Sequence, residues 1–227
     1  MITYEGENVM DITDREELLI RQMRFANGNF HLLKENAVRA INVMGPVGCG
    51  KTTIIEQLVE RLISCGLSVG AIATAATGDT DHQRFLTCGA QSVNVQTGEE
   101  GYLDAFALSR ALSGLDLGAL DVLFIENVPG IISPVDYPLG TDEELVVIPL
   151  TAGNGVVQSY PRIFTQTDLL VINKIDLVSA LNVAPEAIST EYAQVNPHGK
   201  AVFTDAHRGS GIAKLLEALG FDCNTKW

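Results

Sequence analysis

The sequence predicts an α/β fold with a doubly wound, mainly parallel sheet. Short apolar runs alternate with segments of helical periodicity along most of its 227 residues, and this alternation is typical of parallel strands joined by crossover helices. One of these strand-to-helix junctions carries a glycine-rich octapeptide at residues 45–52. We expect a single domain at residues 37–227, preceded by an N-terminal helical extension at residues 1–36.

The composition excludes several classes of protein. A formal net charge of −13 argues against a nucleic-acid partner, since phosphate backbones attract clustered Lys and Arg. No apolar run approaches the roughly 20 residues that would span a bilayer, and the N-terminus lacks the basic and apolar regions of a secretory signal. We therefore expect a cytoplasmic protein with no membrane partner.

The individual elements follow from periodicity. Leu18, Leu19, Met23 and Phe25 give the N-terminal segment an apolar stripe, which we expect to pack outside the sheet. Apolar runs predict strands at residues 40–44, 67–74, 121–126, 144–149, 168–172 and 201–204, and the alternation of polar and apolar residues predicts a strand at 92–96. Helical spacing predicts helices at about 13–33, directly after the octapeptide, around Phe85, at 103–112 and at 210–219.

The octapeptide fits the phosphate-binding pattern G-x-x-x-x-G-K-[ST], with the strand before it and the helix after it that the pattern requires. Backbone N–H groups of such a loop hold phosphate together with the positive end of the helix dipole. Lys51 should reach the β- and γ-phosphates, and the Thr52 hydroxyl should ligate Mg²⁺. The residues assigned to the nucleotide here are Gly45, Val47, Gly48, Cys49, Gly50, Lys51, Thr52 and Thr53.

The cysteines form no C-x-x-C pair that would indicate a zinc site or a disulfide framework. Cys65 and Cys88 are expected to be ordinary buried thiols. Cys49 lies inside the phosphate loop and is either a small substitute for Ser or Ala, or a thiol whose pKa the helix N-terminus lowers.

An acidic residue, Glu126, ends the apolar run at 121–126. Because ligands of parallel sheets bind beyond the carboxyl ends of the strands, Glu126 is expected to hold a water of the Mg²⁺ shell and to act in catalysis with Lys51. Its alternative role is that of a helix cap. Gly130, four residues further on, is expected to offer its backbone N–H to the γ-phosphate.

The segment Asn173-Lys174-Ile175-Asp176 indicates guanine. The Asp176 carboxylate can accept hydrogen bonds from both N1–H and the 2-amino group of guanine, whereas adenine offers no such pair of donors. An unpaired, buried Asp176 would therefore reject ATP, and GTP and GDP are the expected ligands. Thr204, Asp205 and Ala206 are expected to form the small loop on the base. An ATPase of similar fold is the alternative.

With these motifs in this order, the chain resembles the HypB-type nickel-incorporation GTPases of hydrogenase maturation, which are SIMIBI-type P-loop GTPases related to the urease accessory GTPases. Further likeness lies in Leu103-Asp104-Ala105, in residues 123–128 and in residues 171–176. The resemblance implies slow hydrolysis of Mg·GTP, a homodimer that depends on nucleotide, other maturation factors as partners, and nickel delivery to a metalloenzyme precursor.

The chain departs from the family in its metal ligands. Gly101, Tyr102 and Ser133 stand where the family has Cys and His residues that bind metal at the dimer interface, and none of the three is a soft ligand for nickel or zinc. Binding of nickel or zinc therefore stays open. The departure favours a second hypothesis, a GTP-dependent regulatory or scaffolding switch with little or no hydrolysis.

A further departure concerns hydrolysis itself. Thr74-Ala75-Ala76 replaces a family Gly-Asp-Val whose Asp organises Mg²⁺ and the attacking water. Losing such a group lowers the rate, because phosphoryl transfer depends on positioning and charge stabilisation. Asp79 and Asp81, in the next loop, either compensate as catalytic acids or simply face water.

Overall fold

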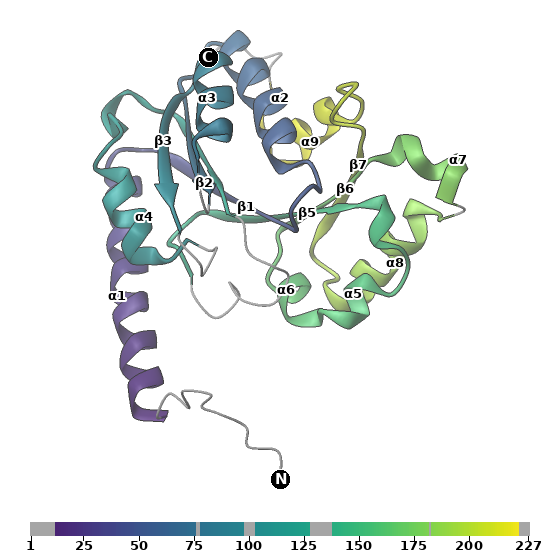
Figure 1. Cartoon of the computed structure of the whole chain (residues 1–227), viewed down its shortest axis with the longest axis horizontal. Coiled ribbons are helices and arrows are strands. Elements are labelled where there is room, and N and C mark those ends of the chain that lie inside the picture. Colours follow the sequence, from purple (N-terminus) through teal and green to yellow (C-terminus); the bar gives the residue numbers. More distant parts are fainter. Residues whose placement is uncertain (1–11, 76–77, 98–102, 128–137, 182, 223–227) are drawn as a thin grey trace.

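The computed structural model describes residues 12–75, 78–97, 103–127, 138–181 and 183–222. Within these residues seven strands form one all-parallel sheet in the order β3-β2-β4-β1-β5-β6-β7 (Figure 1). Their bounds are β1 Arg39–Met44, β2 Val69–Ala75, β3 Gln91–Gln96, β4 Val122–Glu126, β5 Glu143–Pro149, β6 Leu169–Asn173 and β7 Lys200–Thr204. The predicted fold class is confirmed, and the expected strands are present with ends that differ by one or two residues.

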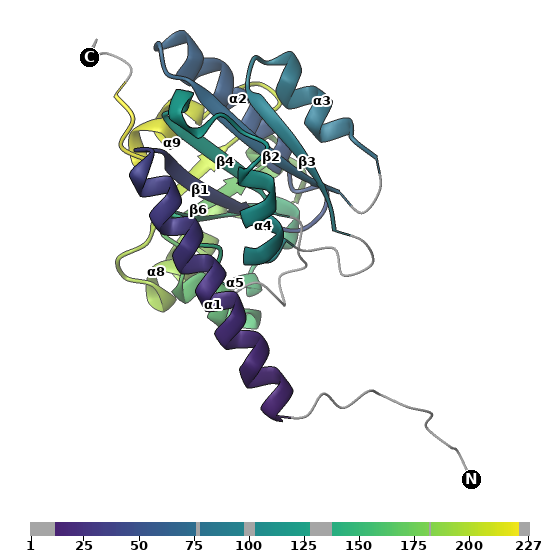
Figure 2. The same ribbon diagram turned by 90° about the vertical axis from the view of Figure 1, so that its left-hand side faces the viewer.

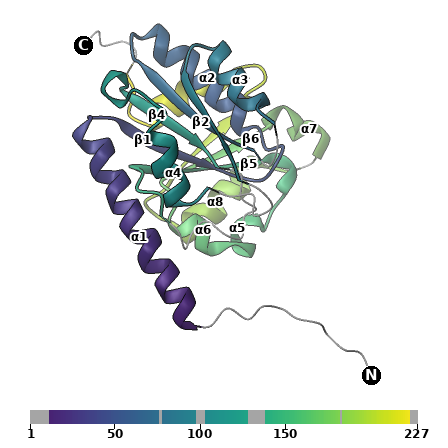
Figure 3. The same ribbon diagram turned by 60° about the vertical axis from the view of Figure 1, so that its left-hand side comes forward.

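Helices cover both faces of the sheet. Their bounds are α1 Ile12–Glu35, α2 Lys51–Ser64, α3 Thr80–Thr87, α4 Ala105–Leu112, α5 Val156–Ser159, α6 Pro161–Thr165, α7 Val178–Leu181, α8 Pro185–Val195 and α9 Ile212–Ala218. Helices α2, α3 and α9 lie on one face, while α1 and α4, then α5, α6 and α8, lie on the other (Figures 1 and 3). Since both faces are covered, central strands such as β4 are fully buried and read as continuous apolar runs, whereas the edge strand β3 is only half-buried and alternates in polarity.

The connectivity places one junction at the centre of the molecule. β1 lies between β4 and β5. From β1 the chain continues to β2 and β3 at one edge of the sheet, and after β4 it crosses over β1 to β5, β6 and β7 at the other edge. The carboxyl end of β1 is thus at the switch point of the sheet, where doubly wound folds bind their ligands. The octapeptide leaves β1 at this point and opens α2.

Helix α1 packs outside the sheet as predicted, but its buried residues differ in part from the expected stripe. It lies beside α4 (Figures 2 and 3), and it buries Gln22, Ala26, Asn29 and Leu33. Met23, expected on the packed stripe, is 55% exposed. The other three residues of the expected stripe, Leu18, Leu19 and Phe25, are half-buried, and the Phe25 ring lies 4.9 Å from the ring of Phe106 in α4. The prediction did not include Gln22 and Asn29, because these polar side chains are buried through hydrogen bonds that apolar spacing does not show.

Hydrogen bonds hold α1 to two distant segments. Asn29 Nδ2 donates to Ala105 O at 2.9 Å and to Leu139 O at 3.0 Å. Gln22 donates to the Asp104 carboxylate at 2.6 Å and accepts from Ala105 N at 3.1 Å. The helix ends at Glu35, one residue before the end of the expected extension.

The segments between β5 and β7 contain helices that the sequence analysis did not predict. Helices α5, α6 and α7 have only four or five residues, too few turns to show a period. Helix α8 did carry a signal, because Pro185 stands at its first position and Ile188 and Tyr192 are buried one turn apart.

The cysteines also correct the prediction. Cys65 is disulfide-bonded, so it is not an ordinary thiol, and Cys88 is half-buried rather than buried. Sequence spacing gave no indication of the bond at Cys65.

Candidate functional site

The phosphate loop has the conformation that its glycines were expected to permit. Gly50 has φ +103°, and a Cβ there would lie 2.3 Å from Asn173 Nδ2. Gly45 has φ +147°, and its Cβ would lie 2.1 Å from Val147 O of β5. Glycine is required at both positions by the left-handed backbone and by the close approach of neighbouring elements. The loop is therefore wedged between β5 and the end of β6, with Gly48 and the 85% exposed Val47 on its outer side.

Lys51 begins α2 and is almost fully buried, with 4% of the residue exposed. Its Nζ donates to Gly45 O at 2.8 Å and to Pro46 O at 3.2 Å. These are carbonyl groups of the loop itself, and a phosphate oxygen is a stronger, charged acceptor for the same ammonium. The lysine is thus held inside the loop, where its charge acts on whatever the loop binds.

Cys49 Sγ is buried in the main core cluster. Burial raises the pKa of this thiol, and the nearby Lys51 charge offsets only part of the effect. Of the two roles considered for Cys49, the structure supports the small buried residue and contradicts the activated thiol, because desolvation outweighs the positive charge.

Glu126 ends β4 directly beside the start of α2. The Thr52 hydroxyl donates to Glu126 Oε1 at 2.7 Å, and Thr74 Oγ1 donates to the Glu126 backbone carbonyl at 2.7 Å. Burial raises the Glu126 pKa to about 7, although the hydrogen bond from Thr52 and the charge of Lys51 oppose the shift. The carboxylate is hydrogen-bonded to Thr52 at the phosphate loop, and it caps none of the helices that the structure describes.

These groups fit a magnesium ion. Glu126 Oε2 is buried without a hydrogen-bond partner, which leaves a costly unsatisfied oxygen in the protein interior. Mg²⁺ is bound through hard oxygen ligands, commonly one or two carboxylates with waters and phosphates. The Thr52 hydroxyl and the Glu126 carboxylate are such ligands, and a magnesium-bound water would supply the partner that Oε2 lacks.

Asn173, at the end of β6, connects the phosphate loop to the loop after β7. Its Nδ2 donates to Cys49 O at 2.8 Å, and its Oδ1 accepts from Thr204 Oγ1 at 3.0 Å and from Ala206 N at 3.1 Å. The side chain is 3% exposed. Asn173 thus braces the two loops that were predicted to hold phosphate and base.

Asp176 lies in the 3-10 turn Ile175–Leu177, which Lys174 enters with φ +64°. About a third of its side chain, 32%, is exposed, and its Oδ2 lies 4.0 Å from Arg208 NH1. The turn leaves Asp176 partly exposed beside Arg208, and its recognition of guanine stays a prediction. Thr204 ends β7, Asp205 and Ala206 follow it, and all three are buried.

The two loop acids differ in their surroundings. Asp81 lies in the first turn of α3, 3.6 Å from Arg84 NH1, and close enough to Glu126 to raise the pKa of that carboxyl. Asp79 precedes α3, is exposed, and accepts from Gln83 Nε2 at 3.2 Å. The structure thus brings Asp81 near the site and leaves Asp79 outside it.

The sequence analysis missed two cationic residues at the site. Arg84 Nε donates to Glu56 Oε1 at 2.8 Å, and its NH2 donates to Thr53 Oγ1 at 3.1 Å. Arg208 reaches Asp176 from the loop after β7. No motif marks Arg84, whereas Arg208 follows directly on the base loop and its position was a usable signal.

Some predicted positions lie outside the described residues, namely Gly130 and the three departures Gly101, Tyr102 and Ser133. Among the residues that the structure does describe, no three His, Cys, Asp or Glu side chains are grouped so that they could hold a metal ion. In the same part of the chain, no helix is both long and apolar enough to cross a bilayer.

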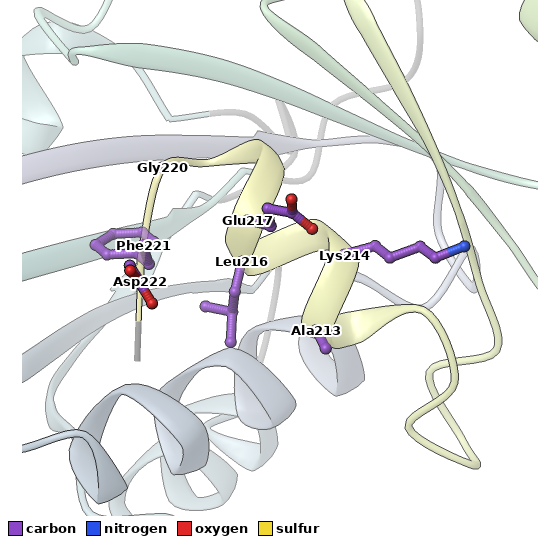
Figure 4. Close-up of a pocket in the computed structure, with 7 residues that line it drawn as sticks. All are labelled: Ala213, Lys214, Leu216, Glu217, Gly220, Phe221 and Asp222. Carbon is purple, nitrogen blue, oxygen red and sulfur yellow. The ribbon is translucent and has the colours of Figure 1, made fainter. Parts of the chain in front are cut away.

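A hollow on the described surface lies apart from this site. It has a volume of about 600 Å³ and lies along α9 and the residues after it (Figure 4). Its lining, from Ala213 to Asp222, includes none of the predicted nucleotide-binding residues.

Comparison with known proteins decides the family. The model of the CobW/HypB/UreG nucleotide-binding domain matches residues 39–203. This chain belongs to that family. A probable hydrogenase maturation factor HypB of Methanocaldococcus jannaschii is 36% identical over 211 residues, which are 93% of this chain and 94% of the relative.

Solved structures agree with the family assignment. The crystal structure of HypB from Archaeoglobus fulgidus has a TM-score of 0.81 and 32% identity, and the match covers 88% of this chain and 98% of that one. HypB from Helicobacter pylori, solved in complex with nickel, has a TM-score of 0.82 over 88% of this chain and 93% of that one. At 22% identity, this second likeness shows the fold alone. The recognised resemblance is thus confirmed.

Proposed function

We propose that this protein binds Mg·GTP and hydrolyses it slowly to GDP and phosphate. The observation that carries the proposal is the contact between Thr52 and Glu126 at 2.7 Å beside the buried Lys51, with one Glu126 oxygen left without a partner. These are the groups that a P-loop nucleotidase places around the β- and γ-phosphates and their metal ion.

In this proposal each residue has a limited task. Lys51 exchanges its loop carbonyl acceptors for phosphate oxygens and offsets their negative charge. Thr52 and Glu126 hold the magnesium ion, which when bound supplies positive charge to the β- and γ-phosphate oxygens. Asn173 keeps the phosphate loop and the base loop at a fixed separation, and Asp176 accepts from the guanine ring. Water attacks the γ-phosphorus, and the bond to the bridging oxygen of GDP breaks.

The test is GTP turnover by the Lys51→Ala variant, with Lys214→Ala as the matched control because Lys214 is an exposed lysine on α9. We expect Lys51→Ala to lose at least about a hundredfold in rate, as removal of a group that stabilises transition-state charge does. Lys214→Ala should keep the wild-type rate. Equal turnover in all three proteins would refute the proposed hydrolysis.

We also propose that Asp81, rather than Asp79, compensates for Ala75. Its support is the proximity of Asp81 to Glu126 and Arg84. Asp81→Asn should lower GTP turnover by about tenfold or more, since water-positioning groups contribute strongly to phosphoryl transfer. Asp79→Asn serves as the comparison and should have no effect. A normal rate in Asp81→Asn would remove Asp81 from the mechanism.

The biological task that we propose is maturation of a metalloenzyme, with nickel as cargo for a hydrogenase precursor and a homodimer that forms when GTP is bound. Support comes from relatives named hydrogenase maturation factors. Light scattering with GDP and with a non-hydrolysable GTP analogue tests the dimer. A mass that is the same with both ligands would contradict nucleotide gating.

A second candidate is a GTP-dependent regulatory or scaffolding switch that handles no metal. It is favoured by the lack of a metal-binding group among the residues that the structure covers and by Ala75 at the end of β2. Calorimetric titration of the protein with Ni²⁺, with and without GTP, separates the two. Stoichiometric binding supports nickel delivery, and no binding in either state supports the switch.

A further inference from the structure

The loop after β7 is closed upon itself and presents a fixed cation. Asp205 and Ser210 exchange two backbone hydrogen bonds of 3.0 Å each. The Asp205 side chain accepts from Arg208 N at 3.2 Å and from Arg208 NH1 at 3.1 Å. Asp205 is 5% exposed, so the carboxylate that holds the guanidinium is itself anchored in the interior.

This anchoring places the guanidinium beside the predicted base-reading carboxylate. Arg208 NH1 lies 4.0 Å from Asp176 Oδ2, and the Arg208 side chain is 68% exposed. An exposed ion pair at this distance contributes little to stability. The relevant property of this ion pair is its geometry. As long as the Arg208 guanidinium is bonded to Asp205, it stays next to Oδ2 of Asp176.

The position has a consequence for base selection. Guanine presents two donors to the carboxylate, N1–H and the 2-amino group, whereas hypoxanthine presents N1–H alone. Where a carboxylate has no other partner, a base that lacks one donor leaves an oxygen unsatisfied and binds weakly. Arg208 can donate to that oxygen, so the missing 2-amino group is replaced by a group of the protein.

We propose that Arg208 is a specificity-determining residue that widens base choice from guanine to hypoxanthine nucleotides. The inference rests on the proposed recognition of guanine by Asp176. Arg208 supplies Asp176 Oδ2 with a donor when hypoxanthine is bound, and it yields that oxygen to the 2-amino group when guanine is bound. The wild-type protein should therefore bind GDP and IDP with similar affinity.

The experiment is calorimetric titration of the full chain with GDP and with IDP, in the presence of Mg²⁺, for wild type and Arg208→Ala. We expect Arg208→Ala to bind IDP roughly tenfold more weakly, the effect of one unsatisfied hydrogen-bonding group. Its affinity for GDP should change by less than about threefold. Arg208→Lys, which keeps the charge, should restore part of the IDP binding.

The ratio of the two affinities separates this role from a purely structural one. If Arg208 only braced the loop, Arg208→Ala would weaken GDP and IDP equally and leave the ratio unchanged, which would overturn the inference. His207→Ala, an exposed neighbour in the same loop, is the control and should keep the wild-type ratio. A wild-type protein that binds neither nucleotide would refute the proposed function and this inference with it, whereas GDP binding with an unaltered ratio would refute the inference alone.

Discussion

Replacement of Asn173 by Ala tests the brace between the phosphate loop and the base loop. The substitution removes three hydrogen bonds of 2.8, 3.0 and 3.1 Å, each worth about 1 kcal/mol. The partners on Cys49, Thr204 and Ala206 are buried, so water cannot readily replace the lost bonds. We expect a loss of about 3 kcal/mol in the free energy of unfolding, which corresponds to a fall of roughly 6–12 °C in Tm for a chain of this size.

Urea denaturation measures the loss, and calorimetric titration with GDP measures its effect on binding. Because Asn173 bonds to both loops, the affinity for GDP should fall by more than tenfold. Thr204→Val removes only one of the three bonds and should cost about 1 kcal/mol. Asn36→Ala removes one exposed hydrogen bond, from Asn36 Nδ2 to Leu32 O, and should cost at most about 1 kcal/mol. A loss below about 1 kcal/mol for Asn173→Ala, or an unchanged GDP affinity, would refute the brace.

Three further predictions follow from buried or crowded groups. Burial raises the Glu144 pKa well above the usual range of a carboxyl, to about 7, so its contribution to stability falls as pH rises from about 4.5 to about 7. Glu144→Gln should be more stable than wild type at pH 8, by at most about 3 kcal/mol, since residue 144 is only partly buried. Urea denaturation at about pH 4.5 and at about pH 8 measures the difference, and equal stabilities of the two proteins at both pH values would contradict the prediction. A Cβ on Gly140 would lie 2.0 Å from Ala26 O, so Gly140→Ala should lower the free energy of unfolding by more than about 2 kcal/mol. Gly66 also has a positive φ, +90°, but open space around it, so Gly66→Ala should lose only about 1 kcal/mol through backbone strain. Similar losses for the two variants would contradict the steric explanation. Since burial raises the pKa of Cys49, mass spectrometry after alkylation at pH 8 should find this thiol unmodified, and rapid labelling would show that it is accessible.

Much of the fold was predictable because the sheet is parallel and buried. Strands covered on both faces read as uninterrupted apolar runs, and the helix after the phosphate loop showed a clear period. The short helices α5 to α7 were not predictable, since four or five residues cannot display one. Helix α1 was located correctly, but the burial of Gln22 and Asn29 was not predicted, because it depends on hydrogen bonds to segments far away in the sequence.

In the candidate site too, local motifs were predictable and contacts between distant segments were less so. Residues within one motif, such as Lys51 and Thr52, were predictable because the pattern fixes their local geometry. The contact of Thr52 with Glu126 spans 74 positions and was expected only from the rule that strand ends meet at one edge of a sheet. The guanidinium of Arg208 beside Asp176 follows from how the last loop folds back, which no local pattern specifies.

The polar face of α1 has a consequence for how this helix tolerates change. When a helix shifts along its neighbours, leucine side chains can exchange one apolar contact for another at a small cost in free energy. A buried amide that loses its hydrogen-bond acceptor in such a shift finds no other acceptor nearby. Gln22 and Asn29 therefore define one register of α1 against the remainder of the protein. A single residue inserted between them would rotate one amide by about 100° relative to the other, so insertions and deletions inside this helix should be far less tolerated than substitutions on its outer side.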